Sequence, residues 1–126
     1  AAVADYRPTV KADQKIKKKD ENLTIELTKT RDIAASLGKL KQKNQVIVGF
    51  ALETEHEQDN ALKKLESKNF DLIVLNSLND AGAGFGHDTN KITMIDRSGS
   101  VKKFDLKSKK AVARDIVSAI LDKVHA

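Results

Sequence analysis

The chain has 126 residues, enough for one domain with a buried core, and it carries a formal net charge of +5. Its composition is 40% hydrophobic and 33% charged, with no apolar run as long as a membrane span, so we expect a cytoplasmic protein without a membrane partner. The absence of cysteine excludes disulfides and thiolate chemistry, and the positive charge favours anionic partners.

The chain opens without an initiator Met on Ala1-Ala2-Val3-Ala4-Asp5, which is typical of the tail of a buried strand with nothing leading into it. Arg7-Pro8 should end this strand, because proline removes a hydrogen-bond donor and fixes φ. We therefore expect an incomplete domain that lacks its amino-terminal half.

Residues 9–22 carry eight charged side chains of mixed sign, most densely around Lys15 to Lys19. A solvated, mobile loop is the usual structure of such a run. The alternative is a flexible basic flap that folds over a polyanion, since several lysines on one loop suit the phosphates of a nucleotide.

Residues 23–28 alternate apolar and polar side chains, which predicts a strand with one solvated face. A helix beginning at Thr30 or Asp32 would have the apolar stripe Ile33, Leu37 and Leu40. Residues 45–50 then form a second apolar strand.

Thr54 and Glu57 have the spacing of a capping box, so a second helix should begin there. The unbroken apolar run at residues 72–75 indicates a strand covered on both faces. This β-α-β-α-β order predicts a Rossmann-like, three-layer α/β fold with a mostly parallel sheet.

The segment after that strand holds Gly82, Gly84 and Gly86, followed by His87 and Asp88. A long glycine-rich loop at the carboxyl end of a buried strand is a frequent ligand site, although a plain surface loop is an equally good interpretation. Residues 92–96 and 101–106 should form a hairpin, and Ser108 should cap a last helix with apolar residues at i+4 steps.

The sequence contains no familiar metal-binding or nucleotide-binding motif that would indicate a function. Its three histidines share no metal-ligand spacing, and neither a Walker loop nor a dinucleotide fingerprint is present. The lysine cluster lacks neighbouring aromatic residues, which argues against a nucleic-acid partner.

Four segments in order nevertheless resemble one family: AAVADYRP at residues 1–8, KIKK at 15–18, GFALET at 49–54 and GAGFGHDTNKIT at 82–93. The series resembles the carboxy-terminal half of bacterial phosphopantothenoylcysteine synthetase, or phosphopantothenate–cysteine ligase, of coenzyme A biosynthesis. That family is often fused behind a flavin-dependent decarboxylase, so FMN is implied only where such a domain lies upstream.

The resemblance implies a CTP-dependent ligase that acts on 4′-phosphopantothenate and cysteine, with Mg²⁺ and through an acyl-cytidylate intermediate. It also implies a homodimer. The nucleotide-binding positions that it implies, with Lys15 as the catalytic lysine, are Ala1, Asp5, Lys15, Arg31, Asp32, Ile33, Ala34, Phe50, Lys64 and Lys68.

The side chains at most of these positions suit a nucleotide. Lysine ammonium groups can neutralise the charge of the phosphates. We expect Phe50 at the end of its strand, where its ring can pack on a base or sugar. The chain departs from the family pattern at Arg31, Leu52, Ser77 and His87, where proline, alanine, aspartate and serine are usual. The family's amino-terminal glycine-rich segment and an asparagine that holds the acyl-cytidylate have no counterpart, so we expect this polypeptide alone to be inactive. The alternative is a non-catalytic nucleotide-binding or dimerisation module of the same fold.

Overall fold

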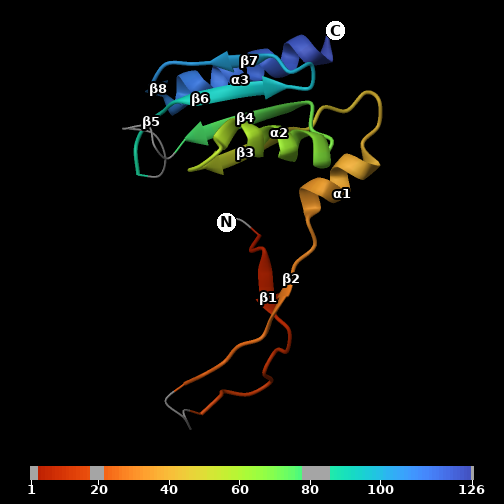
Figure 1. Cartoon of the computed structure of the whole chain (residues 1–126), viewed down its shortest axis with the longest axis vertical. Coiled ribbons are helices and arrows are strands. Elements are labelled where there is room, and N and C mark those ends of the chain that lie inside the picture. The colour runs from red at the N-terminus through yellow and green to blue at the C-terminus, as the bar shows by residue number, and fades with distance from the viewer. Residues whose placement is uncertain (1–2, 18–21, 78–85, 126) are drawn as a thin grey trace. The chain divides into compact units, whose positions relative to one another are not determined.

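The computed structural model describes residues 3–17, 22–77 and 86–125. These residues form two compact units, Ala1–Ile33 and Ala34–Ala126, hereafter unit 1 and unit 2 (Figure 1). The middle of the predicted glycine-rich loop, with Gly82 and Gly84, lies outside the described ranges.

Unit 1 contains one antiparallel ribbon of two three-residue strands, β1 (Tyr6–Pro8) and β2 (Leu27–Lys29). The Thr9 amide donates to the Glu26 carbonyl at 2.9 Å, and the hydroxyls of Thr9 and Thr28 lie 2.6 Å apart. All six strand residues are exposed.

One prediction for this unit is confirmed and one is wrong. The first strand ends at Pro8 as predicted, with Arg7 and Pro8 as its last two residues, and an exposed ribbon tolerates a proline that cannot donate. The strand expected over residues 23–28 covers only Leu27–Lys29, and it pairs with β1 instead of entering a parallel sheet.

Unit 2 is built on a four-stranded sheet in the order β3-β4-β6-β7. Its strands are β3 (Val48–Glu53), β4 (Leu72–Ser77), β6 (Ile92–Asp96) and β7 (Val101–Lys103). Only β3 and β4 are parallel, whereas β4–β6 and β6–β7 are antiparallel. The expected mostly parallel sheet is therefore wrong for the described strands, since a helical crossover joins only β3 to β4 and antiparallel neighbours need none.

The crossover helix is α2 (Glu57–Ser67), which buries Ala61 and Leu65 against one face of the sheet. It begins after His56, a left-handed residue with φ 46° and no side-chain capping bond. A helix thus begins within residues 54–57 as predicted, but the residue at its N-cap is His56 rather than Thr54.

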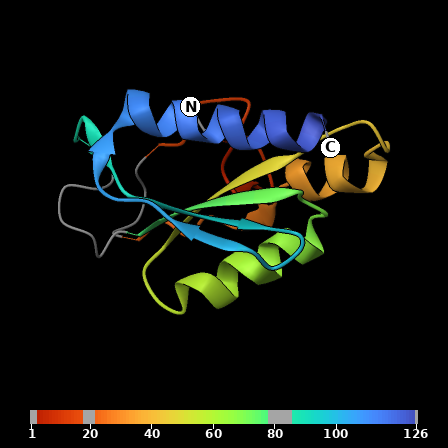
Figure 2. The same ribbon diagram turned by 90° about the horizontal axis from the view of Figure 1, so that it is seen from above.

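The opposite face of the sheet is covered by α3 (Lys109–Val124), as Figure 2 shows. Ser108 caps it as predicted by accepting from the Ala111 amide at 3.2 Å, and Val112 joins a buried cluster with four sheet residues, Leu72, Val74, Ile92 and Met94. Unit 2 thus has the expected helix–sheet–helix layers. A short ribbon, β5 (Thr89–Asn90) with β8 (Lys107–Ser108), lies before this helix.

The first helix, α1 (Ile33–Leu40), does not bury its predicted stripe, since Ile33, Leu37 and Leu40 are exposed. Gly38 is its buried residue. A β-carbon at Gly38 would lie 1.9 Å from the Lys68 carbonyl oxygen, so only glycine permits this approach. None of the helices within the described ranges is long and apolar enough to cross a membrane.

Candidate functional site

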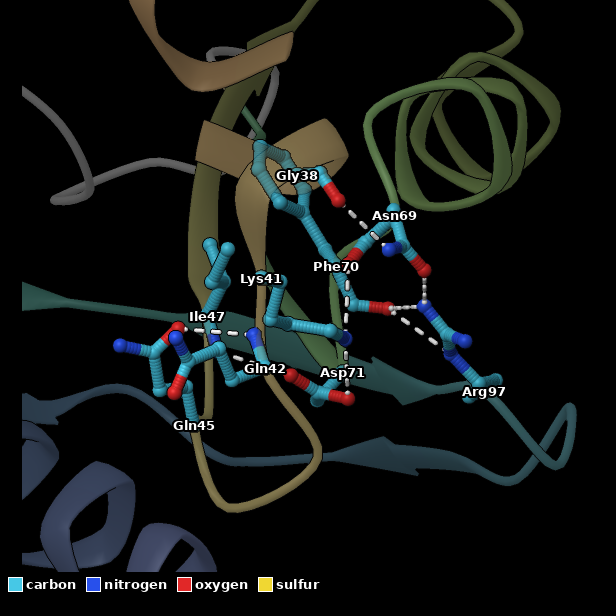
Figure 3. A network of polar contacts seen from close by, with 9 residues as sticks. All are labelled: Gly38, Lys41, Gln42, Gln45, Ile47, Asn69, Phe70, Asp71 and Arg97. Carbon is cyan, nitrogen blue, oxygen red and sulfur yellow. Dashed lines mark hydrogen bonds and ion pairs between the residues drawn. The ribbon is translucent and has the colours of Figure 1, made fainter. Parts of the chain in front are cut away.

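A polar network ties the amino-terminal end of β4 to its surroundings (Figure 3). Lys41 Nζ donates to Asp71 Oδ1 at 2.8 Å, and the Ile47 amide donates to Asp71 Oδ2 at the same distance. Burial raises the pKa of Asp71, but these two hydrogen bonds and the charges of Lys41 and Arg97 together bring it below its usual value. Asp71 is therefore held as a carboxylate.

The same network includes Asn69, whose left-handed backbone (φ 57°) turns the chain from α2 into β4. Its side-chain amide donates to the Gly38 carbonyl at 2.7 Å, and Arg97 donates to the Phe70 carbonyl and to Asn69 Oδ1. Every one of these donors has a partner within the protein, so we assign the network a structural role.

The carboxyl end of β3 is the better candidate for a ligand site, because ligands of α/β sheets bind where the parallel strands end. Glu53 closes this strand and accepts from Lys64 Nζ at 2.5 Å, with Asn60 Nδ2 at 3.4 Å. The Lys64 side chain is 42% exposed, so a solvent anion can reach its ammonium group.

The neighbouring strand, β4, also ends in polar residues. Asn76 Oδ1 accepts from Asn90 Nδ2 at 2.8 Å. A cavity of about 150 Å³ lies nearby, lined by Glu57, Gln58, Leu75, Lys91, Thr93, Lys103 and Phe104. This end of the sheet therefore combines lysines, amides and a carboxylate.

Among the described residues, the predicted nucleotide-binding positions of unit 2 lie on both faces of the sheet. Phe50 is the third residue of β3, not its last, and the residue is 66% exposed on the face that α3 covers elsewhere. Lys64 and Lys68 belong to α2 and its end, on the other face, and Ala34 packs against the cluster beneath α2. None of the described pockets is lined by any of these four residues.

The remaining predicted positions belong to unit 1. Asp5 is exposed, and its carbonyl accepts from the Thr30 amide at 2.8 Å. Lys15 is exposed in a segment without regular structure, and Arg31, Asp32 and Ile33 are exposed where α1 begins. Ala1 lies outside the described residues.

The sequence interpretation missed Glu53, Asn76 and Asn90 as candidate polar groups. A usable signal existed, because Glu53 and Asn76 directly follow apolar runs that predict buried strands. Asn90 could not have been found in this way, since its contact with Asn76 depends on how β6 folds back along β4.

Comparison with known proteins gives the chain a family. Residues 1–124 match the model of the DNA/pantothenate metabolism flavoprotein C-terminal domain. The chain is 45% identical over 120 residues to the coenzyme A biosynthesis bifunctional protein CoaBC of Bacillus subtilis, and 36% identical over 124 residues to that of Escherichia coli. It is also 58% identical over 125 residues to a cysteine/cysteine sulfinic acid decarboxylase from an unknown prokaryotic organism.

These alignments cover 95%, 96% and 99% of the chain but only 29%, 30% and 35% of the respective relatives. The chain thus spans about a third of their length. Among solved structures, the C-terminal domain of CoaBC matches 99% of this chain, with a TM-score of 0.74 and 37% identity, and the chain covers 52% of it. A flavoprotein from Streptococcus pneumoniae, with a TM-score of 0.65 and 22% identity, shares the fold. The chain therefore belongs to the DNA/pantothenate metabolism flavoprotein C-terminal domain family.

Proposed function

We propose that this chain supplies much of the CTP site of a phosphopantothenate–cysteine ligase, an acid–amino-acid ligase of coenzyme A biosynthesis, and acts together with further polypeptide. The observation that carries the proposal is the match to the solved CoaBC C-terminal domain over 99% of the chain at 37% identity. Because the chain covers only 52% of that domain, we expect it to be inactive alone.

In the proposed reaction, the carboxylate of 4′-phosphopantothenate attacks the α-phosphate of CTP, and pyrophosphate leaves. The amino group of cysteine then attacks the acyl carbon, an amide forms, and CMP leaves while the amine loses a proton. Charge accumulates on the phosphates during the first step, so fixed cations are the main help that a protein can give.

Lys64 fits that role by its position and its partner. Its ammonium group lies at the end of a parallel strand and is neutralised by Glu53 at 2.5 Å. A phosphate oxygen would replace this carboxylate as the partner of Lys64. Lys15 would bring a second cation from the basic flap, and Lys68 a third from the end of α2.

Mg²⁺ would supply further neutralisation of the triphosphate. The parts of the chain that the structure describes contain no group of three His, Cys, Asp or Glu side chains suited to a metal ion. We therefore expect the ion to be held by phosphate oxygens and water together with at most one or two carboxylates, as Mg²⁺ usually is.

The test is a pair of lysine substitutions in the complete ligase. We expect Lys15→Gln to lower the rate of acyl-cytidylate formation by about 10²-fold or more, since it removes a cation from the reacting phosphates. The matched control is Lys11→Gln, an exposed lysine of the same segment, which should stay within about twofold. Unchanged turnover of the Lys15 variant, with an unchanged melting temperature, would refute the proposal.

A second candidate comes from the relative with 58% identity, which is named a decarboxylase. The chain would then be a non-catalytic nucleotide-binding or dimerisation module attached to such an enzyme. Titration with CTP, ATP and single-stranded RNA, with and without Mg²⁺, separates the candidates, since the ligase requires CTP preference. Measurement of the molecular mass in solution tests the proposed homodimer.

A further inference from the structure

A cavity of about 340 Å³ lies between the second half of α3 and the hairpin formed by β6 and β7. Its floor is apolar and consists of Leu72, Met94 and Ala119. All of its lining residues belong to unit 2, and it lies beside the amino-terminal end of β4, whereas the candidate ligand site lies at the carboxyl ends of β3 and β4. Its volume falls within the range of small-molecule sites, which starts at about 300 Å³.

The small side chain of Ala119 leaves this space open. Val112, Ile116 and Ala119 follow one another at steps of four and three residues, so they share the face of α3 that packs on the sheet. Val112 and Ile116 carry branched side chains, whereas Ala119 ends at its β-carbon. The helix thus fills its contact with the sheet near Val112 and leaves a cavity near Ala119.

Two carboxylates lie at the rim of this cavity. Asp122 is exposed, and within the described part of the chain it has neither an ion pair nor a hydrogen bond. Asp96 Oδ1 accepts from the Ser98 hydroxyl at 2.6 Å, from the Ser98 amide at 2.9 Å and from the Ser100 amide at 3.1 Å. The bond from the Ser98 hydroxyl is the largest cause of a pKa of Asp96 below its usual value. Asp96 is therefore ionised at neutral pH.

Two ammonium groups lie at the same rim. Lys123 Nζ is 3.4 Å from Asp96 Oδ2, longer than the spacing of about 2.7–2.9 Å that is typical of a charge-assisted hydrogen bond. The side chains of Asp96 and Lys123 are 26% and 27% exposed, so a ligand can reach both. Lys102 lies beside Met94 in the sheet, and its ammonium group is 5.1 Å from the centre of the Phe104 ring. Within the described residues, Lys102 donates no hydrogen bond, so its donors are available to a ligand.

We propose that this cavity binds a small zwitterion with an apolar side chain, of the class of the free aliphatic amino acids. The ammonium group of the ligand would lie between Asp96 and Asp122. Its carboxylate would accept from Lys102 and Lys123, and its side chain would contact Met94. The rim carries two charges of each sign, so a ligand with one charge of each sign matches it better than a pure anion or a pure cation. This site is separate from the proposed nucleotide site and does not depend on it.

The test measures the binding of three probes to the 126-residue chain by NMR titration. L-leucine carries both charges, isopentylamine lacks the carboxylate, and 4-methylpentanoate lacks the ammonium group. We expect leucine to bind at least about tenfold more tightly than either of the other probes, with the largest shifts at amides of β7 and the second half of α3. Equal affinities, tighter binding of a probe with one charge, or no binding of leucine at about 10 mM would overturn the proposal.

A cavity-filling substitution locates the site. Ala119→Leu should weaken leucine binding at least about tenfold, because the new side chain occupies the space of the ligand. The matched control is Ala113→Leu, the same change at an exposed position of α3, which should alter the affinity less than about twofold. Circular dichroism checks that both variants fold. Equal effects of the two substitutions would contradict the assigned cavity.

A second pair of variants tests the rim without changing the core. Asp122→Asn should weaken leucine binding about threefold, since an exposed charge contributes modestly to an ion pair. Asp105→Asn removes an exposed carboxylate that does not line the cavity, so it should leave the affinity unchanged. If Ala119→Leu does not fold, this pair decides the outcome. An unchanged affinity of the Asp122 variant would then overturn the proposal, whatever the result with CTP.

Discussion

Units 1 and 2 contain similar apolar strand residues, but these residues are exposed in unit 1 and buried in unit 2. Leu27 in unit 1 is 54% exposed, whereas Ile73 in unit 2 is fully buried. No described residue of unit 1 is buried, and the two buried clusters of the structure both lie in unit 2. The difference shows that an apolar strand becomes a core only when a helix covers it, and that a two-stranded ribbon alone is marginal.

The strongest test of this difference in burial is to shorten one apolar side chain in each unit and compare the losses of stability. Ile73→Ala should lower the free energy of unfolding by about 4 kcal/mol, because it leaves a cavity between the sheet and α2. Leu27→Ala should cost less than about 0.5 kcal/mol, since its side chain is already solvated. Urea unfolding measures both. Similar losses would mean that unit 1 has a core in solution.

The next largest effect tests the close approach of α1 to the end of α2. Gly38→Ala should cost about 2–3 kcal/mol, because the new methyl group would overlap the Lys68 carbonyl and force the helix away. Lys39→Ala, one residue later on the exposed side of the helix, is the control and should change stability little. A stable Gly38 variant would show that α1 is loosely attached to unit 2.

A smaller loss, of about 2 kcal/mol at pH 7, is expected for Asp71→Asn, which removes the ion pair with Lys41. Folding lowers the pKa of Asp71 from its usual value of 3.8. The ionised carboxylate therefore stabilises the folded protein fully at pH values above 3.8, and this stabilisation is lost as the pH falls through the lowered pKa. The difference between wild type and variant should therefore shrink below about pH 4. A difference independent of pH in thermal melts would contradict this explanation.

The smallest effect concerns the cap of α3. Ser108→Ala should cost about 1 kcal/mol, because the Ala111 amide loses its acceptor. Ser108→Asp should largely restore stability, since aspartate also caps helices. The two variants together distinguish a lost cap from a general disturbance of the short β5–β8 ribbon.

Sequence patterns predicted the structure correctly where the pattern itself reflects the burial or the capping of the element. The run at residues 72–75 is a buried strand as predicted, because α3 covers Leu72 and Val74 while α2 covers Ile73 and Leu75. The cap at Ser108 also followed from local chemistry.

Other predictions failed because they depended on distant contacts. The apolar stripe of α1 correctly marked a helix, but periodicity does not show whether a partner for the stripe is present. The direction of β6 depends on its pairing with β4 and left no local signal. In the candidate site, the resemblance predicted Lys64, and only the structure shows that Lys64 pairs with Glu53.

The position of α3 at the end of the described chain has a consequence for biosynthesis. Leu72 and Val74 leave the ribosome long before Val112, the buried residue of α3 that covers them. Until then the sheet presents one apolar face to solvent, which favours chaperone binding or aggregation. A chain truncated before Lys109 should therefore bind chaperones or aggregate, and the full chain should not.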